Sequence, residues 1–465
     1  MSEVTKKPAP LADQDIHADL ILRGDPWRVT WQMAWPAVAV MILWGLNAVM
    51  DAVYIGQLLG PQALAGAVLG YPVTQLTLGL SSLAGIGGGV VLSIAIGRGD
   101  REMMRRLPGT VLTLAVVLSL FYGLLGGLFA EALVMGMGAR GELVPIAAEY
   151  LRASAIGGVG AIAGMSLNML LRGEGKMKLA AAFMAAGLLA NIILTPIFIL
   201  VLDMGVGGAA WATNVGGAVG AWLVWRRFRL GRASYPVDPT YLGLHRALRG
   251  RIIRSGFPAM VMSAMGLVQS LVVFNVLTRV GEESDVAFFG AAWRILIFML
   301  TPLFGLMRAY QPVAGINYGA GQWDRVRTTY WTFVKAGLIF ILPVWLLMTI
   351  YPELTLSMML PARGWTGEDI YLFRVLMVVL PVLPIVFTAL ALLPAIEQPG
   401  KATMVSVSRQ LLLYAPVMLI LPAIVGVPGI YYGSTAIDLL CAVWLLWLVR
   451  SSFRQAEQQP LPQRR

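Results

Sequence analysis

The sequence has little charge, a single cysteine and only two histidines. Charged residues make up 13% of its 465 residues and hydrophobic residues 58%, a balance that excludes an ordinary soluble globular protein. Cys441 stands alone, so no intramolecular disulfide can form. His17 and His245 lie in polar segments, and no Cys/His cluster has metal-ligand spacing. The sequence therefore predicts no metal site, no cofactor and no catalytic residue.

Long apolar segments recur along the chain. Residues 1–30 are polar and contain no apolar core of a signal peptide, so we expect no cleaved leader. Beyond them, apolar segments of roughly 20 residues recur, each long enough to cross a hydrocarbon core of about 30 Å. Twelve are predicted, at 33–56, 63–95, 107–130, 145–171, 178–202, 207–225, 255–279, 285–311, 329–351, 370–395, 402–425 and 429–449. The predicted fold class is an all-α integral membrane protein with twelve transmembrane helices.

The two halves of the chain resemble each other at an offset of about 222 residues. Gly97-Arg98-Gly99-Asp100 matches Gly319-Ala320-Gly321-Gln322, and Pro36 matches Pro258. Six spans in each half give two six-helix lobes that enter the membrane in the same direction, as parallel repeats related by a pseudo-two-fold axis. The predicted organisation is a cytoplasmic tail (1–32), an N-lobe (33–225), a basic cytoplasmic linker (226–254), a C-lobe (255–449) and a second cytoplasmic tail (450–465). Paired lobes favour transport, with the substrate path between them, over a passive channel.

The net charge of +11 follows the predicted topology. Basic residues gather in the termini, the linker and alternate loops, whereas the loops at 57–62, 203–206 and 425–428 contain none. This alternation is the positive-inside rule, which places both termini in the cytoplasm of a multi-pass protein of the cell membrane. The lipid bilayer is thus the expected partner of the basic surface, and nucleic acid is not.

Several motifs resemble those of multidrug and toxic compound extrusion (MATE) transporters, over both lobes. In the first lobe they are Pro36, Asp51 with Ile55-Gly56, Gly97-Arg98-Gly99-Asp100, Asn191 to Ile199 and Gly205 to Thr213; in the second they are Gln311-Pro312, Gly315 to Gly321 and Arg409-Gln410. The seventh span lacks a carboxylate and is more similar to the prokaryotic DinF-like branch. The resemblance implies two six-helix bundles in a V. It also implies that the substrates are amphipathic or cationic drugs and toxic metabolites. These would be exported in exchange for H⁺ or Na⁺ by a rocking motion of the two lobes. We expect a monomer.

Asp51 is the leading candidate for the coupling residue. It lies within the first span, about 8 Å from the outer end, and an acid at membrane depth is costly unless it has a function. By resemblance, Asn191 and Thr213 belong to the same cation-coupling network. Thr195 stands where that family commonly has an aspartate, and it shares a helix face with Asn191. A hard cation prefers several oxygens including carboxylate, so we hypothesise H⁺ coupling through Asp51 with Na⁺ coupling weakened.

Charged residues also lie within the spans of the second lobe. Asp438 is about nine residues into the last span and could pair with Arg409 or with Arg294. A structural ion pair is the first interpretation and a second coupling site the other.

The residues that line the substrate cavity are harder to identify from the sequence than the coupling residues. Candidate cavity residues are Gln75, Asn168, Met260, Met265, Gln269, Asn275 and Tyr310. Flexible methionines suit a pocket that accepts many shapes, although ordinary packing explains most of them. A flippase for lipid-linked precursors is an alternative of similar architecture, for which Arg294 and Arg308 would have to hold pyrophosphate. A membrane enzyme is the other alternative, but no nucleophile has a nearby histidine base.

Overall fold

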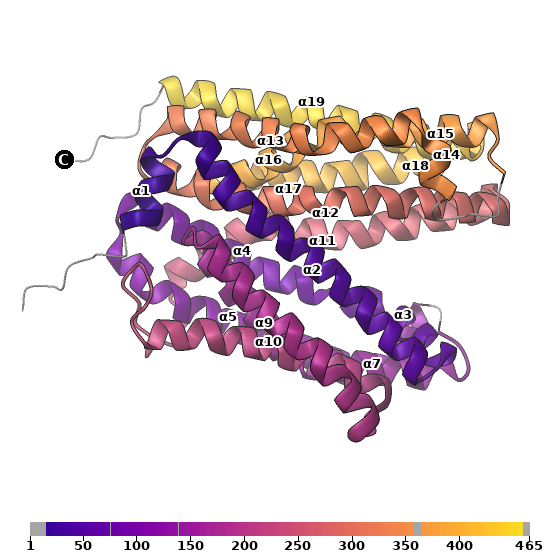
Figure 1. The fold of residues 1–465 in the computed structure, drawn as a ribbon, viewed down its shortest axis with the longest axis horizontal. Helices are drawn as coiled ribbons and strands as arrows, with labels where there is room; N and C mark the ends of the chain where they lie inside the picture. The colour runs from indigo at the N-terminus through magenta and orange to yellow at the C-terminus, as the bar shows by residue number, and fades with distance from the viewer. Residues whose placement is uncertain (1–14, 75, 138, 358–363, 459–465) are drawn as a thin grey trace, which may run out of the picture.

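The computed structural model describes residues 15–458, apart from 75, 138 and 358–363, and these residues form helices and no strands. The short α1 (Asp15–Arg23) precedes the first lobe (Figure 1). The N-lobe comprises α2 (Pro26–Leu58), α3 (Pro61–Thr74), α4 (Leu76–Arg98), α5 (Arg101–Leu128), α6 (Ala130–Gly136), α7 (Leu143–Ile156), α8 (Gly158–Gly173), α9 (Met177–Pro196), the π-helical η1 (Ile197–Val201) and α10 (Gly205–Arg229). The C-lobe comprises α11 (Arg246–Val280), α12 (Glu283–Gly319), α13 (Trp323–Ile350), α14 (Pro352–Ser357), α15 (Gly367–Met377), the short 3₁₀ turn η2 (Leu380–Val382), α16 (Leu383–Ala395), α17 (Pro399–Val407), the π-helical η3 (Ser408–Tyr414), α18 (Ala415–Val425) and α19 (Pro428–Gln458).

The predicted all-α membrane fold is confirmed. Within the described residues, nine helices are long and apolar enough to cross a membrane, and α7 with α8, bent by 49°, makes ten. Helices α10 and α11 run beside them, and with these two the helices correspond to the twelve predicted spans. The predicted segment 63–95 is longer than one span requires, and it is divided into α3 and α4 on either side of residue 75.

The helix ends reflect the internal repeat. Asp100 caps α5 by accepting a hydrogen bond from the Met103 backbone N–H at 3.0 Å. Just before it, Gly99 ends α4 with a φ of +68°, and Gly321 ends α12 with a φ of +76°. Glycine adopts this left-handed conformation without the strain that a side chain would add. The same stop signal at the same offset places α5 and α13 in equivalent positions of the two lobes.

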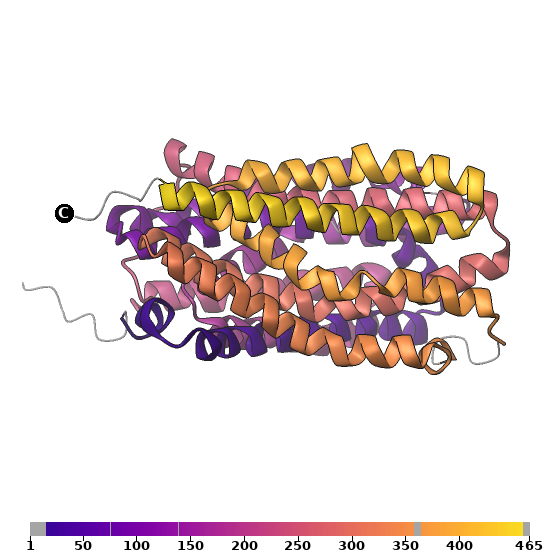
Figure 2. The same cartoon turned by 90° about the horizontal axis from the view of Figure 1, so that it is seen from above.

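The lobes converge at the end of the molecule where α1 begins and α19 ends, and they diverge toward the other end (Figure 1). Seen from above, the C-lobe helices lie in front of the N-lobe helices (Figure 2). At the convergent end α4 contacts α11 and α12 across the interface. A side chain at Gly97 would overlap the carbonyl oxygen of Ile316, and one at Gly319 would overlap that of Ile94. These contacts are reciprocal and relate residues 222 apart, as expected where a pseudo-two-fold axis passes between the two glycines.

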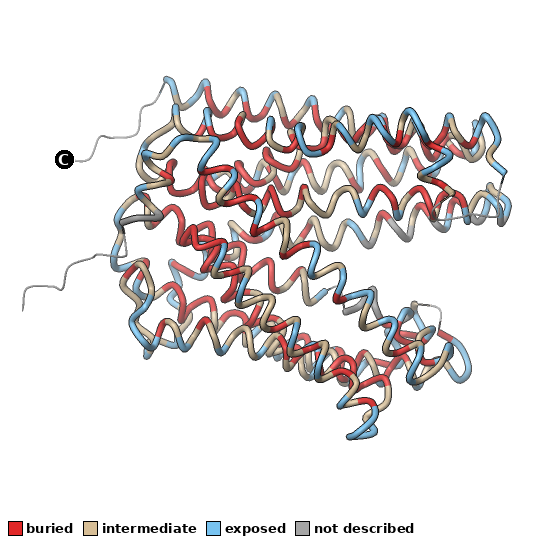
Figure 3. The backbone as a smooth tube through the Cα atoms, in the orientation of Figure 1, coloured by how far each residue is buried: buried red, intermediate tan, exposed pale blue. Residues whose placement is uncertain are grey.

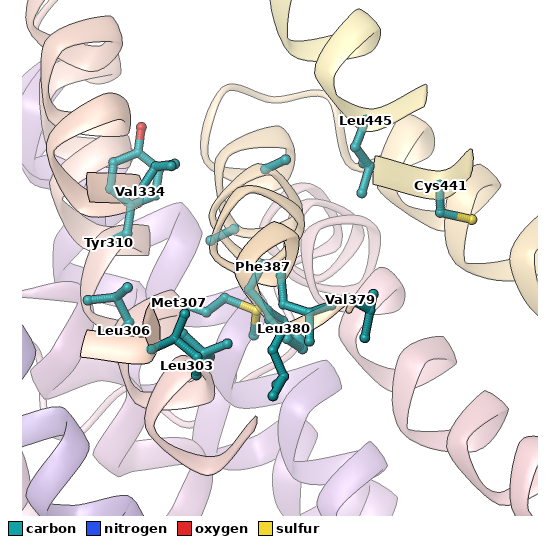
Figure 4. Packing of buried hydrophobic residues seen from close by; sticks show 14 of the residues in the cluster. Leu303, Leu306, Met307, Tyr310, Val334, Val379, Leu380, Phe387, Cys441 and Leu445 are labelled. Atoms are coloured by element: carbon teal, nitrogen blue, oxygen red, sulfur yellow. The ribbon is translucent and has the colours of Figure 1, made fainter. Parts of the chain in front are cut away.

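Burial is concentrated in the same region, as the tube in Figure 3 shows. The apolar part of α4 is 89% buried, whereas that of α2 is 22% buried, so α4 is a central helix and α2 faces outward along much of its length. In the C-lobe, side chains from α12, α13, α16 and α19 pack together, including Tyr310, Phe387 and Leu445, and this core continues into the N-lobe (Figure 4). Cys441 belongs to this core and is 2% exposed.

The connection between the lobes is shorter than the predicted linker of residues 226–254, because α10 continues to Arg229 and α11 begins at Arg246. The segment between them is attached to the N-lobe. Asp238 forms an ion pair with Arg105 at 3.3 Å, and the buried Glu174 carboxylate accepts a hydrogen bond from the Ser234 backbone N–H at 2.8 Å. Hydrogen bonds from Thr240 and the charge of Arg105 lower the pKa of Asp238.

Candidate coupling site in the N-lobe

A cavity of about 450 Å³ lies within the N-lobe. Side chains from α2, α3, α4, α7, α8, α9 and α10 line it, most of them apolar or small. Among the described residues that line this cavity, Asp51 is the only one with a charged side chain. The cavity therefore offers one ionisable carboxyl in a largely apolar enclosure.

Three helices bring polar groups to this carboxyl. Thr195 on α9 points its hydroxyl at Asp51 Oδ1 at 3.5 Å, and Asn47, one turn earlier on α2, points its amide nitrogen at Oδ2 at 3.4 Å. Both distances are long for hydrogen bonds. The Thr195 hydroxyl also lies 2.9 Å from the Asn191 carbonyl oxygen, which is the better acceptor for its single proton. Asp51 is thus enclosed but weakly held.

Asn191 and Thr213 complete the cluster. The Asn191 amide donates to the Thr213 hydroxyl at 2.9 Å, which joins α9 to α10, and both residues are close enough to interact with Asp51. The structure thus brings together all four residues of the predicted network. Asn191 is 2% and Thr195 0% exposed, whereas Thr213 is exposed.

Two buried acceptor atoms in the cluster have no donor. The side-chain carbonyl oxygens of Asn47 and Asn191 make no hydrogen bond. Buried acceptors are normally satisfied, and leaving one unpaired costs about 1–3 kcal/mol. Together with the Asp51 carboxylate they form a group of oxygens suited to receive a proton or another positive species. Asn47 was not among the sequence candidates, although its position four residues before Asp51 places it on the same helix face.

Known proteins resemble this chain in sequence and in fold. The sequence model of the MatE family matches residues 36–197 and again residues 258–420, which is one match in each lobe at the repeat offset. The chain belongs to the MATE transporter family. Multidrug export protein MepA of Staphylococcus aureus strain MSSA476 is 23% identical over 419 residues, covering 89% of this chain and 91% of that protein. An FAD transporter of Shewanella oneidensis is 25% identical over 443 residues, covering 91% and 94%.

Solved structures of the family share the fold. A crystal structure of MATE in the bent conformation has a TM-score of 0.88 at 25% identity and covers 96% of this chain and 99% of that one. A transporter of the MOP superfamily from Pyrococcus furiosus, described as having a binding pocket of reverse polarity, has a TM-score of 0.85 at 25% identity, covering 95% and 98%. This MATE protein is therefore a multi-pass membrane transporter, related to drug exporters, and not an enzyme.

In the C-lobe of this MATE protein, Asp438 meets Arg409 and not Arg294. The Arg409 guanidinium donates to Asp438 Oδ1 from Nη2 at 2.6 Å and from Nε at 2.8 Å, and Nη1 also reaches Gln269 Oε1 and Gln410 Oε1 at 3.1 Å. Arg294 is exposed on α12. Arg409 lies in the π-helical η3, where the wider turn changes the direction of the side chains that follow.

The seven substrate-surface candidates do not gather in one place. Asn168 lines the N-lobe cavity, and Met260 packs against Gly79 between the lobes. Gln269 belongs to the Arg409 network, Met265 is partly buried on α11, and Asn275 is exposed. Tyr310 is fully buried in the C-lobe core and donates to the Val326 carbonyl oxygen at 3.2 Å, so its surroundings are those of a packing residue. Gln75 lies outside the described residues.

Proposed function

We propose that this MATE protein is a secondary antiporter that exports amphipathic organic cations in exchange for protons, which Asp51 carries. The observation that supports the proposal most is that Asp51 is the only charged group among the described residues lining the N-lobe cavity. A carboxylate there attracts a cation, whereas the protonated acid does not. Proton and organic cation therefore compete for one group, and competition of this kind is sufficient for exchange.

The oxygens around Asp51 support the protonated state. A protonated carboxyl has an O–H to donate, and the unpaired carbonyl oxygens of Asn47 and Asn191 are acceptors in the same cluster. The site suits Na⁺ less well than H⁺. It prefers several oxygens including carboxylate, and Thr195 supplies a neutral hydroxyl where a second acid would help to balance its charge.

The charge of the two ends indicates the orientation of the protein in the membrane, and export is the direction that the family resemblance implies. The convergent end, where the termini and the linker lie, holds Arg98, Arg105 and Arg325 among other basic residues. By the positive-inside rule this end is cytoplasmic, and the divergent end faces outward. Export then requires the lobes to rock apart at the close contact between Gly97 and Gly319.

Uptake of a fluorescent organic cation into inside-out vesicles tests the coupling. The parent protein should accumulate the dye under a pH gradient, and Asp51→Asn should abolish the gradient-dependent part. Asp203→Asn is the matched control, because Asp203 is an exposed acid of the same lobe whose φ of +49° asparagine also adopts readily. Thermal unfolding of both variants in detergent verifies that they are folded.

Two results would contradict the proposal. If Asp51→Asn accumulates the dye like the parent, the proton is carried by another group. If a Na⁺ gradient at constant pH drives equal accumulation, the preference for H⁺ is wrong. Failure of every cation tried, with the parent protein folded, would favour the flippase alternative, in which a lipid-linked precursor is the substrate.

A further inference from the structure

Arg172 on α8 is buried and Arg308 on α12 is partly buried, and neither arginine has a carboxylate partner among the described residues. Arg172 is 4% exposed; its Nε donates to Asn168 Oδ1 at 3.1 Å and its Nη2 contacts the Met184 sulfur at 3.4 Å, but its Nη1 has no partner. Arg308 has buried Nε and Nη1 atoms and makes no hydrogen bond or ion pair with any described residue.

The two guanidinium groups belong to different lobes, on helices α8 and α12, which contact each other across the interface. They are near enough for the charge of Arg308 to act on Arg172. One turn before Arg308, a side chain at Gly305 would come within 2.9 Å of the Val38 Cα on α2, so this face of α12 lies directly against the N-lobe. The pair therefore spans the interface between the lobes.

Neither an ion pair nor a bridge between backbone segments explains these two arginines. Buried charges within a membrane are normally paired, and an arginine that holds backbone together donates to carbonyl oxygens, as Arg325 does to Ile21 and Gly24. Arg308 does neither, and the two like charges repel. The neighbouring acid in the sequence, Glu174, is already shared by Lys176 and Arg227. An anion that is not part of the protein would satisfy the free donors of both arginines.

The N-lobe cavity is separated from Arg172 by two side chains that contact it. Asn168 and Met184, the two side chains that hold the Arg172 guanidinium, both line the cavity. Guanidinium groups are planar forks whose donors match phosphate oxygens in bidentate fashion. Two of them at one place suit a phosphate or pyrophosphate group.

We propose that Arg172 and Arg308 together bind a phosphate group, one guanidinium from each lobe. The phosphate belongs either to a phosphorylated amphipathic solute or to a phospholipid headgroup. Binding replaces repulsion across the interface with attraction to a shared anion, so it stabilises the conformation in which the lobes converge here. Separation of the lobes at this end divides the site and releases the group. This inference goes beyond the proton-coupled export of cations and does not depend on it.

Flavins provide a matched pair of probes, because FAD carries a pyrophosphate and riboflavin has the same ring system without it. In neutral phosphatidylcholine nanodiscs, FAD should raise the melting temperature of the parent protein and riboflavin should not. Arg172→Gln and Arg308→Gln should each weaken the FAD effect by at least about tenfold in concentration. Arg294→Gln is the control, since Arg294 is an exposed arginine of the same helix and should leave the effect unchanged.

A second arm separates the two sources of phosphate. Phosphatidylglycerol is added to the nanodiscs without flavin. A rise in melting temperature that is absent from the Arg172→Gln/Arg308→Gln protein assigns the site to a lipid headgroup, and a flavin effect with no lipid effect assigns it to a soluble ligand. If neither probe distinguishes the parent from the double variant, the proposal is wrong.

The unliganded proteins provide an independent readout. Replacing either arginine removes repulsion and unpaired donors, so each glutamine variant should unfold at the same or a higher temperature than the parent. A clear loss of stability without ligand would show that the arginines hold the helices together and would overturn the proposal. Arg172→Lys, which keeps the charge but lacks the fork, should keep a weakened flavin effect. Proton-driven dye uptake should persist in the arginine variants, and the flavin effect should persist in Asp51→Asn, so the two proposals can fail separately.

Discussion

At the scale of single residues, the acid within the C-lobe and the acid within the N-lobe differ in how strongly their carboxyl groups are bound. Asp438 accepts two hydrogen bonds from one guanidinium, with distances of 2.6 and 2.8 Å, whereas Asp51 has only long contacts to neutral groups. A strongly paired carboxylate is held in its charged form, and a weakly held one is free to change its state. The contrast favours a structural role for Asp438 and a coupling role for Asp51.

Removal of the Asp438 charge should therefore affect stability more than coupling. Asp438→Asn leaves Arg409 without a counter-charge, and we expect a loss of roughly 2–3 kcal/mol, less than the 3–5 kcal/mol typical of fully buried pairs, because both side chains are partly exposed at 26% and 20%. Thermal unfolding in detergent measures the loss. The exchanged pair, Asp438→Arg with Arg409→Asp, should recover part of it. A stable Asp438→Asn protein with altered pH dependence of transport would instead identify a second coupling site.

At the scale of helices, the close contact of α4 with α12 depends on two glycines related by the repeat. Gly319→Ala would place a methyl group against the Ile94 carbonyl oxygen, and overpacking of this kind typically costs about 1–3 kcal/mol. Gly290→Ala on the same helix meets nothing within 4 Å and should stabilise the helix slightly, by up to about 1 kcal/mol. Melting temperatures of the two variants test this difference. Equal effects would mean that the contact between the lobes does not require glycine at position 319.

Much of the helical architecture was predictable, because membrane spans have the strongest signal that a sequence can carry. Length and hydropathy place the rods, and the repeat pairs the lobes. The bend of 49° after Ile156 and the π-helical turns at 197–201 and 408–414 were not predicted. These features depend on packing between helices, which hydropathy does not report. The repeat pairs Gly97 with Gly319, but it did not indicate that the two glycines would face each other across the lobes.

Part of the candidate site was predictable because the depth of a residue within its span can be counted from the sequence. Asp51, Asn191, Thr195 and Thr213 lie at matching depths in their spans, so the sequence and the family resemblance suffice to group them. Arg172 was not singled out from the sequence, and Arg308 was considered only together with Arg294, as a ligand for pyrophosphate in the flippase alternative. Which cations lack a carboxylate is a property of the three-dimensional arrangement, and no spacing in the sequence reports it.

At the scale of the whole molecule, the ion pair between Arg98 and Glu397 joins the lobes at the convergent end. Arg98 donates to Glu397 in bidentate fashion at 2.6 and 3.0 Å, and Tyr318 donates to the same carboxylate at 3.1 Å. Glu397 follows α16 with a φ of +59°, unusual for a residue with a side chain. Partial burial opposes its charge, but the hydrogen bonds and charge of Arg98 outweigh burial and lower the pKa of Glu397 below its ordinary value of 4.5.

This pair should favour the convergent conformation at neutral pH and cease to do so in acid. Because the pKa of Glu397 is lower in the folded protein, the stabilisation is fully present above about 4.5 and is lost as the pH falls through the folded value. Both side chains are about a third or more exposed, at 34% and 42%, so we expect no more than about 1 kcal/mol. The melting temperature of Glu397→Gln should be lower than that of the parent at pH 7, and the two should converge once the pH falls below the folded pKa of Glu397.

Labelling of a buried thiol relates the same pair to the separation of the lobes. Ser93 is fully buried where α4 meets Gly315 of the other lobe, so Ser93→Cys in a Cys441→Ala background should react with a maleimide only when the lobes part. Loss of about 1 kcal/mol would raise the open population and the labelling rate up to about fivefold in Glu397→Gln. Arg98→Gln should have the same effect, and the double variant should add nothing to it, because each single change already breaks the pair. Additive effects would mean that Arg98 and Glu397 act through separate contacts and not as a pair. An unchanged rate in all three would mean that the glycine contacts alone hold this end closed.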